Sequence, residues 1–212
     1  MMSAEEALER LILGNRRFAG ELFGDHGIRG QARRSELRQS QAPFAIILGC
    51  SDSRVPAEII FDQGLGDLFV IRVAGNIVAP SQVGSVEFAA ERFGTPLVVV
   101  LGHSRCGAVL ATIEELEQPG SDRSPNLARI VDFIRPAVQP LYEAGTGWER
   151  DELIHHSVRA NIRASAGHLR HGSPILERLT QEHGLLVVGA EYSLDDGTVD
   201  FFDGVPDELI NR

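Results

Sequence analysis

Four short apolar runs, at 44–48, 68–73, 97–101 and 185–190, restrict the folds that this chain can adopt. Each run has little polar alternation and is bounded by turn-forming or polar residues. Runs of this kind are typical of strands that are buried on both faces, as in a parallel sheet covered by helices. Since helical segments separate the runs, we expect an α/β fold with a parallel four-stranded sheet, right-handed crossovers and helices on both faces.

Helical periodicity and turn signals define the segments between and around these strands. Ser3, with a glutamate three residues later, has the pattern of a capping box and predicts the start of the first helix. The turn signal at 195–197 predicts that 198–202 returns as an antiparallel edge strand. Pro136 is expected to interrupt the helix that contains it. The predicted helices are 3–18, 33–40, 56–61, 81–93, 107–117, 126–144, 149–171 and 174–183.

The length of 212 residues suits one well-buried α/β core and is short for two independent domains. We therefore expect a single domain over 1–212, in which 1–40 form an N-terminal helical arm and 41–203 form the α/β core. The apolar face of the first helix needs a partner. The sequence leaves open whether that helix packs on its own core or across another subunit.

The charge balance excludes some classes of partner. The formal net charge is −10, so no excess of basic residues exists to neutralise nucleic-acid phosphates or an anionic membrane surface. No apolar run approaches the roughly 20 residues that span a bilayer. The sequence begins without a basic-then-apolar signal segment, so we expect a cytoplasmic protein with reduced cysteines. Small neutral or singly charged molecules remain as possible ligands.

Polar, chemically reactive side chains follow two of the predicted strands at the points where the strands end. The first apolar run leads into Cys50, Asp52 and Arg54, and the third leads into His103 and Cys106. Ligands of open α/β sheets bind at the carboxyl ends of the strands. Thiolates, an imidazole and a carboxylate are all zinc ligands, and Cys50, Asp52, His103 and Cys106 together make a tetrahedral set.

Asp52 can bind either the metal ion or Arg54, and which of the two it binds decides whether the metal site is structural or catalytic. In an extended backbone, Asp52 and Arg54 point the same way, so the carboxylate can bind either zinc or the guanidinium. A zinc site that is closed by four protein ligands is typically structural, whereas three ligands and an open position are typical of a catalytic site.

Other interpretations of these segments are weaker but remain open. Cys50 and Cys106 could be buried apolar cysteines or a disulfide, although neither accounts for His103 and Asp52 beside them. The segment 102–107 could be a glycine-rich phosphate loop, but it lacks the dinucleotide fingerprint and the P-loop lysine. A cysteine nucleophile activated by His103 is also conceivable, and it would leave the second cysteine unexplained.

The paired motifs resemble the two signatures of the β-carbonic anhydrases. The segment 50–54 reads Cys-Ser-Asp-Ser-Arg and 103–107 reads His-Ser-Arg-Cys-Gly, and residues 5–203 are similar to that family in element order. The resemblance implies a zinc enzyme that converts carbon dioxide to bicarbonate and a proton. It also implies a homodimer or a dimer of dimers. Cys50, His103 and Cys106 would then bind zinc, and Asp52 and Arg54 would form the catalytic pair.

The same resemblance implies a set of substrate-binding residues and one departure from the family. Gln41, Phe69 and Gly107 match cleft positions, with Gln41 and Phe69 reaching across the dimer interface. Phe88 stands where many members have a tyrosine, so a phenol hydroxyl is absent there. Phe69, Phe88 and Ile47 are candidates for the apolar walls of a carbon dioxide pocket.

A regulatory bicarbonate site of some family members is expected to be incomplete here. Those members use a tryptophan, an arginine and a tyrosine. The arginine matches Arg72 and the tyrosine matches Tyr192, but the tryptophan position is Ile47.

Two rival functions are kept beside carbon dioxide hydration. One is the hydrolysis of carbon disulfide or carbonyl sulfide on the same scaffold. The other is a non-catalytic interaction protein that zinc stabilises, which requires Asp52 to close the metal site permanently. The presence of Arg54 as a competing partner argues against the second.

Overall fold

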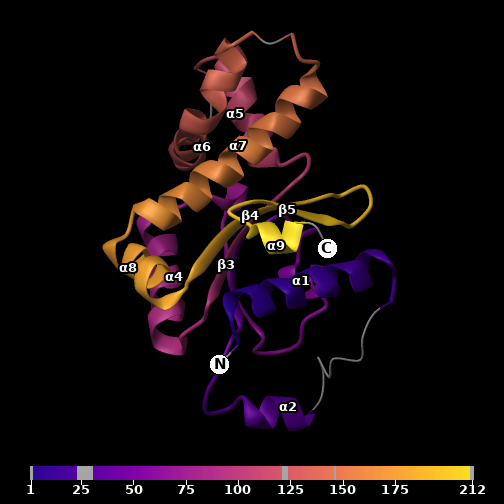
Figure 1. The fold of residues 1–212 in the computed structure, drawn as a ribbon. Helices are drawn as coiled ribbons and strands as arrows, with labels where there is room; N and C mark the ends of the chain where they lie inside the picture. Colours follow the sequence, from indigo (N-terminus) through magenta and orange to yellow (C-terminus); the bar gives the residue numbers. More distant parts are fainter. Residues whose placement is uncertain (1, 23–30, 121–123, 146, 211–212) are drawn as a thin grey trace.

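A single five-stranded sheet organises the part of the chain that the computed structural model describes, residues 2–22, 31–120, 124–145 and 147–210 (Figure 1). Its order is β2-β1-β3-β4-β5, with parallel pairing throughout except between β4 and β5. The strands are β1 (Ala45–Gly49), β2 (Leu68–Arg72), β3 (Leu97–His103), β4 (Leu186–Tyr192) and β5 (Val199–Asp203). The predicted parallel sheet with one antiparallel edge strand is confirmed.

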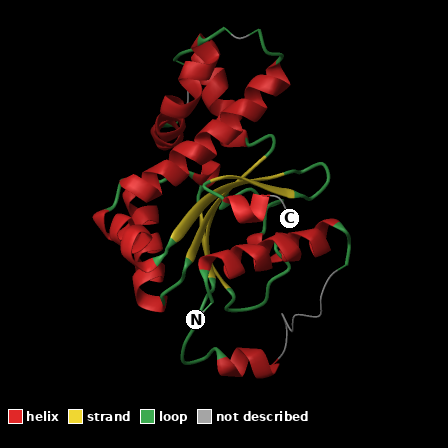
Figure 2. Cartoon of the chain, in the orientation of Figure 1, coloured by secondary structure: helices red, strands yellow, loops and turns green. Residues whose placement is uncertain are grey.

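Helices cover both faces of the sheet, as the uninterrupted apolar runs predicted (Figure 2). On one face pack α4 (Pro80–Phe93), α5 (Gly107–Glu117), α6 (Pro125–Glu143), α7 (Arg150–His171) and α8 (Pro174–His183). On the other pack α1 (Ala4–Ala19), α3 (Ala57–Ile60) and α9 (Asp207–Ile210). The remaining described helices are α2 (Gln31–Glu36) and the short 3-10 helix η1 (Ala74–Asn76). None of the helices in these described ranges is long and apolar enough to cross a membrane.

Successive side chains of each strand point to opposite faces of the sheet, so each strand contributes to both helical layers. In β1, Ile46 and Leu48 point into the cluster under α4 to α8, while Ala45 and Ile47 point into the cluster under α1 and α3. All of these side chains are fully buried. Because a shift of one residue would exchange the two faces, this burial holds β1 in register with its neighbours.

Helix α1 packs on the sheet of its own chain, which decides between the two alternatives that the sequence left open. Leu8 and Leu11 are fully buried in the cluster that contains Ile47 and Leu101. The predicted capping box is present: the Ser3 hydroxyl accepts from the backbone N–H of Glu6, whose carboxylate accepts from the backbone N–H of Ser3. The division into an arm at 1–40 and a core at 41–203 stays a prediction, and 23–30 lie outside the described residues.

Several predicted element bounds differ from the structure. Helix α6 continues through Pro136 without the expected break, because its apolar face buries Val131, Ile134 and Val138 against neighbouring helices. Strands β3 and β4 extend two residues beyond their apolar runs, since backbone pairing of Gly102 and His103 with β4 does not depend on apolar side chains. The helix expected at 33–40 lies at Gln31–Glu36.

Replacing Leu8 with alanine tests the packing of α1. We expect Leu8→Ala to lower the free energy of unfolding by about 2–5 kcal/mol, because it leaves a cavity between α1 and the sheet. Leu13 lies on the same helix and is 46% exposed, so Leu13→Ala should change the stability by no more than about 0.5 kcal/mol. Urea unfolding at one fixed protein concentration measures both, and equal effects would contradict the packing described here.

Candidate metal centre

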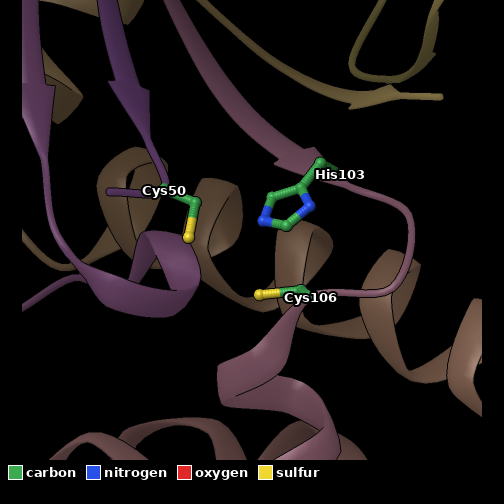
Figure 3. Close-up of side chains that lie close together, drawn as sticks. All are labelled: Cys50, His103 and Cys106. Atoms are coloured by element: carbon green, nitrogen blue, oxygen red, sulfur yellow. The ribbon is translucent and has the colours of Figure 1, made fainter. Parts of the chain in front are cut away.

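Two neighbouring parallel strands bring three metal-binding side chains together. Cys50 follows the end of β1, His103 is the last residue of β3, and Cys106 directly precedes α5. All three are buried, and their ligand atoms lie within 4.8 Å of one another. Figure 3 shows the two sulfur atoms and the imidazole ring turned toward a common point. The structure therefore assembles three of the four residues predicted from the strand ends.

His103 is held in the tautomer and orientation that metal binding requires. Its Nδ1 lies 2.9 Å from the backbone carbonyl oxygen of Ser104 and donates to it, so Nε2 carries a lone pair. The Nε2 atom is buried and has no hydrogen-bond partner among the described residues. A buried nitrogen without a partner is costly, and a metal ion between His103 and the two sulfurs would satisfy it.

The two thiols form an unequal pair. The hydrogen bond from Cys106 lowers the pKa of Cys50 to about 4, against the opposing effect of burial. The same contact, together with burial, raises the pKa of Cys106. Both cysteines are free, so the alternative of a disulfide is not what the structure contains. Two soft sulfur donors and one imidazole fit zinc better than a hard cation such as magnesium.

Asp52 lies at the edge of this group and is held by Arg54. The Arg54 Nε and Nη2 atoms donate to the two carboxylate oxygens at 2.9 and 2.7 Å, and the Arg54 backbone N–H donates to Oδ1 at 3.0 Å. Hydrogen bonding from Arg54 holds the pKa of the Asp52 carboxyl well below its usual range. The Oδ2 atom remains 3.8 Å from Nε2 of His103. Asp52 is thus an ionised neighbour of the three potential ligands, bound to Arg54.

The predicted substrate-binding residues do not all gather at this point within one chain. Gly107 is the first residue of α5 and lies next to Cys106. Phe69, however, pairs with Ile46, four residues before Cys50 and about 13 Å back along the strand direction. Gln41 precedes β1 and is exposed at the opposite end of that strand.

Phe88 and Ile47 also lie apart from the three potential ligands. The ring of Phe88 is 54% exposed and packs edge-on against that of Phe93, with the centroids 5.6 Å apart. Phe69 joins these two rings, and the three phenylalanines form an aromatic cluster between β2 and α4. Ile47 faces α1 in the cluster opposite to that of Cys50, so the expectation that it lines the same pocket is wrong.

Two further residues contact the site, and the sequence did not predict their roles. Arg72, at the end of β2, donates from Nε to the carbonyl oxygen of Cys50 at 3.0 Å and from Nη2 to that of Asp52 at 2.6 Å. The backbone N–H of Gly75 donates to the Cys50 sulfur, with 3.3 Å between the two atoms. The sequence analysis named Arg72 only for a regulatory anion site, and its place at the carboxyl end of a strand beside β1 could have indicated its contact with this site. A backbone donor such as Gly75 leaves no signal in side-chain identity.

Comparisons with known proteins agree with the motifs. Residues 45–199 match the family model for carbonic anhydrase. Carbonic anhydrase 2 of Mycobacterium tuberculosis is 41% identical over 196 residues, which cover 90% of this chain and 89% of that protein. The β-carbonic anhydrase CafA of Aspergillus fumigatus has a TM-score of 0.75 at 24% identity, over 95% of this chain and 93% of that one. One of two tetrameric β-carbonic anhydrases from Sordaria macrospora has a TM-score of 0.74 at 23% identity, over 92% and 96% of the two chains.

The donor set predicts the metal content and the reactivity of the thiols. We expect about one zinc per chain, and both cysteines should resist thiol reagents until a chelator is added, because zinc-bound thiolates are neither exposed nor free. His103→Ala should lose the metal and destabilise the fold, since metal binding and folding are linked. Elemental analysis and thiol titration with and without chelator measure these effects. Thiols that react fully in zinc-loaded protein would contradict the assignment.

Proposed function

Because this chain belongs to the β-carbonic anhydrase family, whose members hydrate carbon dioxide reversibly with zinc, we propose that Cys50, His103 and Cys106 hold the metal and that Asp52 and Arg54 form the catalytic pair. The observation that carries the proposal is the two-point contact between Arg54 and Asp52 beside three convergent donors. A closed structural site would need Asp52 as its fourth ligand. With Asp52 held by Arg54, the chain supplies three donors, and a metal held by them would be left with a position for substrate chemistry.

Each residue of the proposed site has a separate task. A zinc ion bound there would act as a Lewis acid and would lower the pKa of a bound water toward 7, so that a nucleophile is available near neutral pH. His103 and the two cysteines fix the position of the ion. Asp52 stays ionised and acts as a hydrogen-bond acceptor that orients the attacking water toward carbon dioxide. Arg54 keeps the carboxylate in place and prevents it from becoming a ligand.

The proposed substrate cleft needs a second copy of the chain. Gln41 and Phe69 lie at the other end of β1 and β2 from the metal site, so they can act in substrate binding only from a partner subunit. The aromatic cluster of Phe69, Phe88 and Phe93 supports this arrangement, because the exposed ring of Phe88 offers an apolar surface for a partner. We propose a homodimer, which could pair further into tetramers like those from Sordaria macrospora.

A reducing compartment suits the proposed site. Cys50 and Cys106 lie close enough that oxidation would compete with metal binding, and both are free in the structure. We therefore propose that the protein acts as one domain in the cytoplasm. Assays with carbon dioxide, carbonyl sulfide and carbon disulfide on the same preparation distinguish carbon dioxide hydration from the hydrolysis of the two sulfur compounds.

Substitutions of the catalytic pair separate catalysis from metal binding. Asp52→Asn should keep zinc but lose most of the hydration activity, because an amide cannot serve as the charged acceptor opposite Arg54. Arg54→Ala should also keep zinc and lose activity, since the released carboxylate is then free to close the metal site. Stopped-flow hydration assays with zinc analysis measure both outcomes.

The matched control is Arg178→Ala, which removes an exposed arginine that pairs with Glu91 far from the motifs. Its activity and zinc content should equal those of the unchanged protein. Loss of zinc in Asp52→Asn would make Asp52 a structural ligand and would refute its catalytic role.

Added bicarbonate should inhibit the protein without cooperativity. Ile47 is fully buried and has no N–H in its side chain, so it cannot replace an indole donor. An anion beside Tyr192 would therefore lack a partner, at a cost of about 1–3 kcal/mol. Two donor groups of Arg72 are also engaged by the carbonyl oxygens of Cys50 and Asp52. Rates measured against bicarbonate concentration should fall hyperbolically, and a sigmoidal loss of activity would contradict this prediction.

A further inference from the structure

The turn η1 lies behind the metal centre and has an unusual backbone conformation. Both Gly75, at φ +72°, and Asn76, at φ +44°, adopt the left-handed region, which few residues other than glycine and asparagine adopt. This conformation directs the Gly75 N–H at the Cys50 sulfur. Gly75 cannot be replaced easily, because a Cβ atom there would lie 2.7 Å from Ile134 and 2.9 Å from Ala108.

Two polar side chains of α7 hold this turn from the other side. Asn161 donates from Nδ2 to the carbonyl oxygen of Gly75 at 2.8 Å, and Ser165 donates from Oγ to the carbonyl oxygen of Asn76 at 3.1 Å. The two residues are one helical turn apart, and their exposed fractions are only 2% and 5%. With Ser157 they form a buried polar stripe along α7, beside the apolar core residues Val158, Ile162 and Ala166.

We propose that Asn161 and Ser165 are positioning residues of the metal centre, which act on Cys50 through the backbone of Gly75. The inference rests on the proposed role of Cys50 as a zinc ligand. A hydrogen bond to a thiolate withdraws charge from sulfur and fixes its direction, and groups that orient metal ligands in this way commonly affect metal affinity by about 10- to 100-fold. Because Asn161 and Ser165 hold the carbonyl groups of both left-handed residues of the turn, loss of either side chain frees the backbone that directs the N–H at the sulfur.

Substitutions on α7 test this role against a merely structural one. Asn161→Leu keeps the branching at Cγ but removes the donor to Gly75, and Ser165→Ala removes the donor to Asn76. Ser157→Ala is the matched control, because Ser157 is fully buried on the same helix and its hydroxyl has no hydrogen-bond partner among the described residues. Zinc affinity is measured by competition with a chelator. Cobalt-substituted protein reports the sulfur-to-metal charge-transfer band.

We expect Asn161→Leu to lower zinc affinity by about 10- to 100-fold, because the Cys50 sulfur is then no longer held in the direction that metal binding needs. The charge-transfer band should shift to longer wavelength, because a thiolate that loses a hydrogen-bond donor is richer in electrons. Ser165→Ala should change both quantities in the same direction and by less, and it carries the test if Asn161→Leu does not fold. Ser157→Ala should leave both unchanged. If the variants are less stable but have the zinc affinity and the cobalt spectrum of the unchanged protein, the positioning role of Asn161 and Ser165 is refuted and the proposed metal centre is not. Failure of the unchanged protein to bind zinc would overturn the proposed metal centre as well.

Discussion

The parallel pairing of β1 with β3 is the constraint on which the rest of the site depends. Gly49 pairs with Leu101, so Cys50 leaves β1 close to the level at which β3 reaches His103. Two strands in antiparallel order would place these side chains at opposite edges of the sheet. The burial of both faces of β1 and β3 fixes the register, since a one-residue slip would move apolar side chains between two different helical layers. Core packing thus sets the geometry of the donors.

The charge of Asp52 is the second determinant of what the site can do. A carboxylate this close to three potential ligands has the option of completing a closed, four-coordinate site. Arg54 competes with a metal ion for Asp52, because it donates hydrogen bonds to both carboxylate oxygens. Lysine could not make the same two-point contact. Arg72 adds rigidity by binding the backbone on each side of Ser51, so the short segment that carries Asp52 has little freedom to move. The position of Asp52 away from the three potential ligands is therefore set by contacts along this whole segment.

Helix α7 has a double role in the molecule. Most of its buried face is apolar and covers β3 and β4. At Asn161 and Ser165 the same face instead satisfies two backbone carbonyls of η1, which would otherwise be buried without partners. Polar groups in a core are stabilising only when they are paired, and here each one has a specific acceptor. The helix connects the packing of the sheet with the backbone that surrounds Cys50.

Local sequence patterns determined the strands, most of the helices and the three potential metal ligands. Apolar runs identified the strands because burial on both faces leaves a signal in composition, and the placement of Cys50 and His103 after such runs indicated a shared edge. The boundaries at Pro136 and His103 were missed because helix packing and backbone pairing, which are tertiary, override local preference there. Only the tertiary structure decided that Asp52 binds Arg54, since an extended segment allows either partner. It alone also revealed the contact of Asn161 with Gly75, because residues 86 positions apart in the chain meet only after the sheet and α7 have packed together.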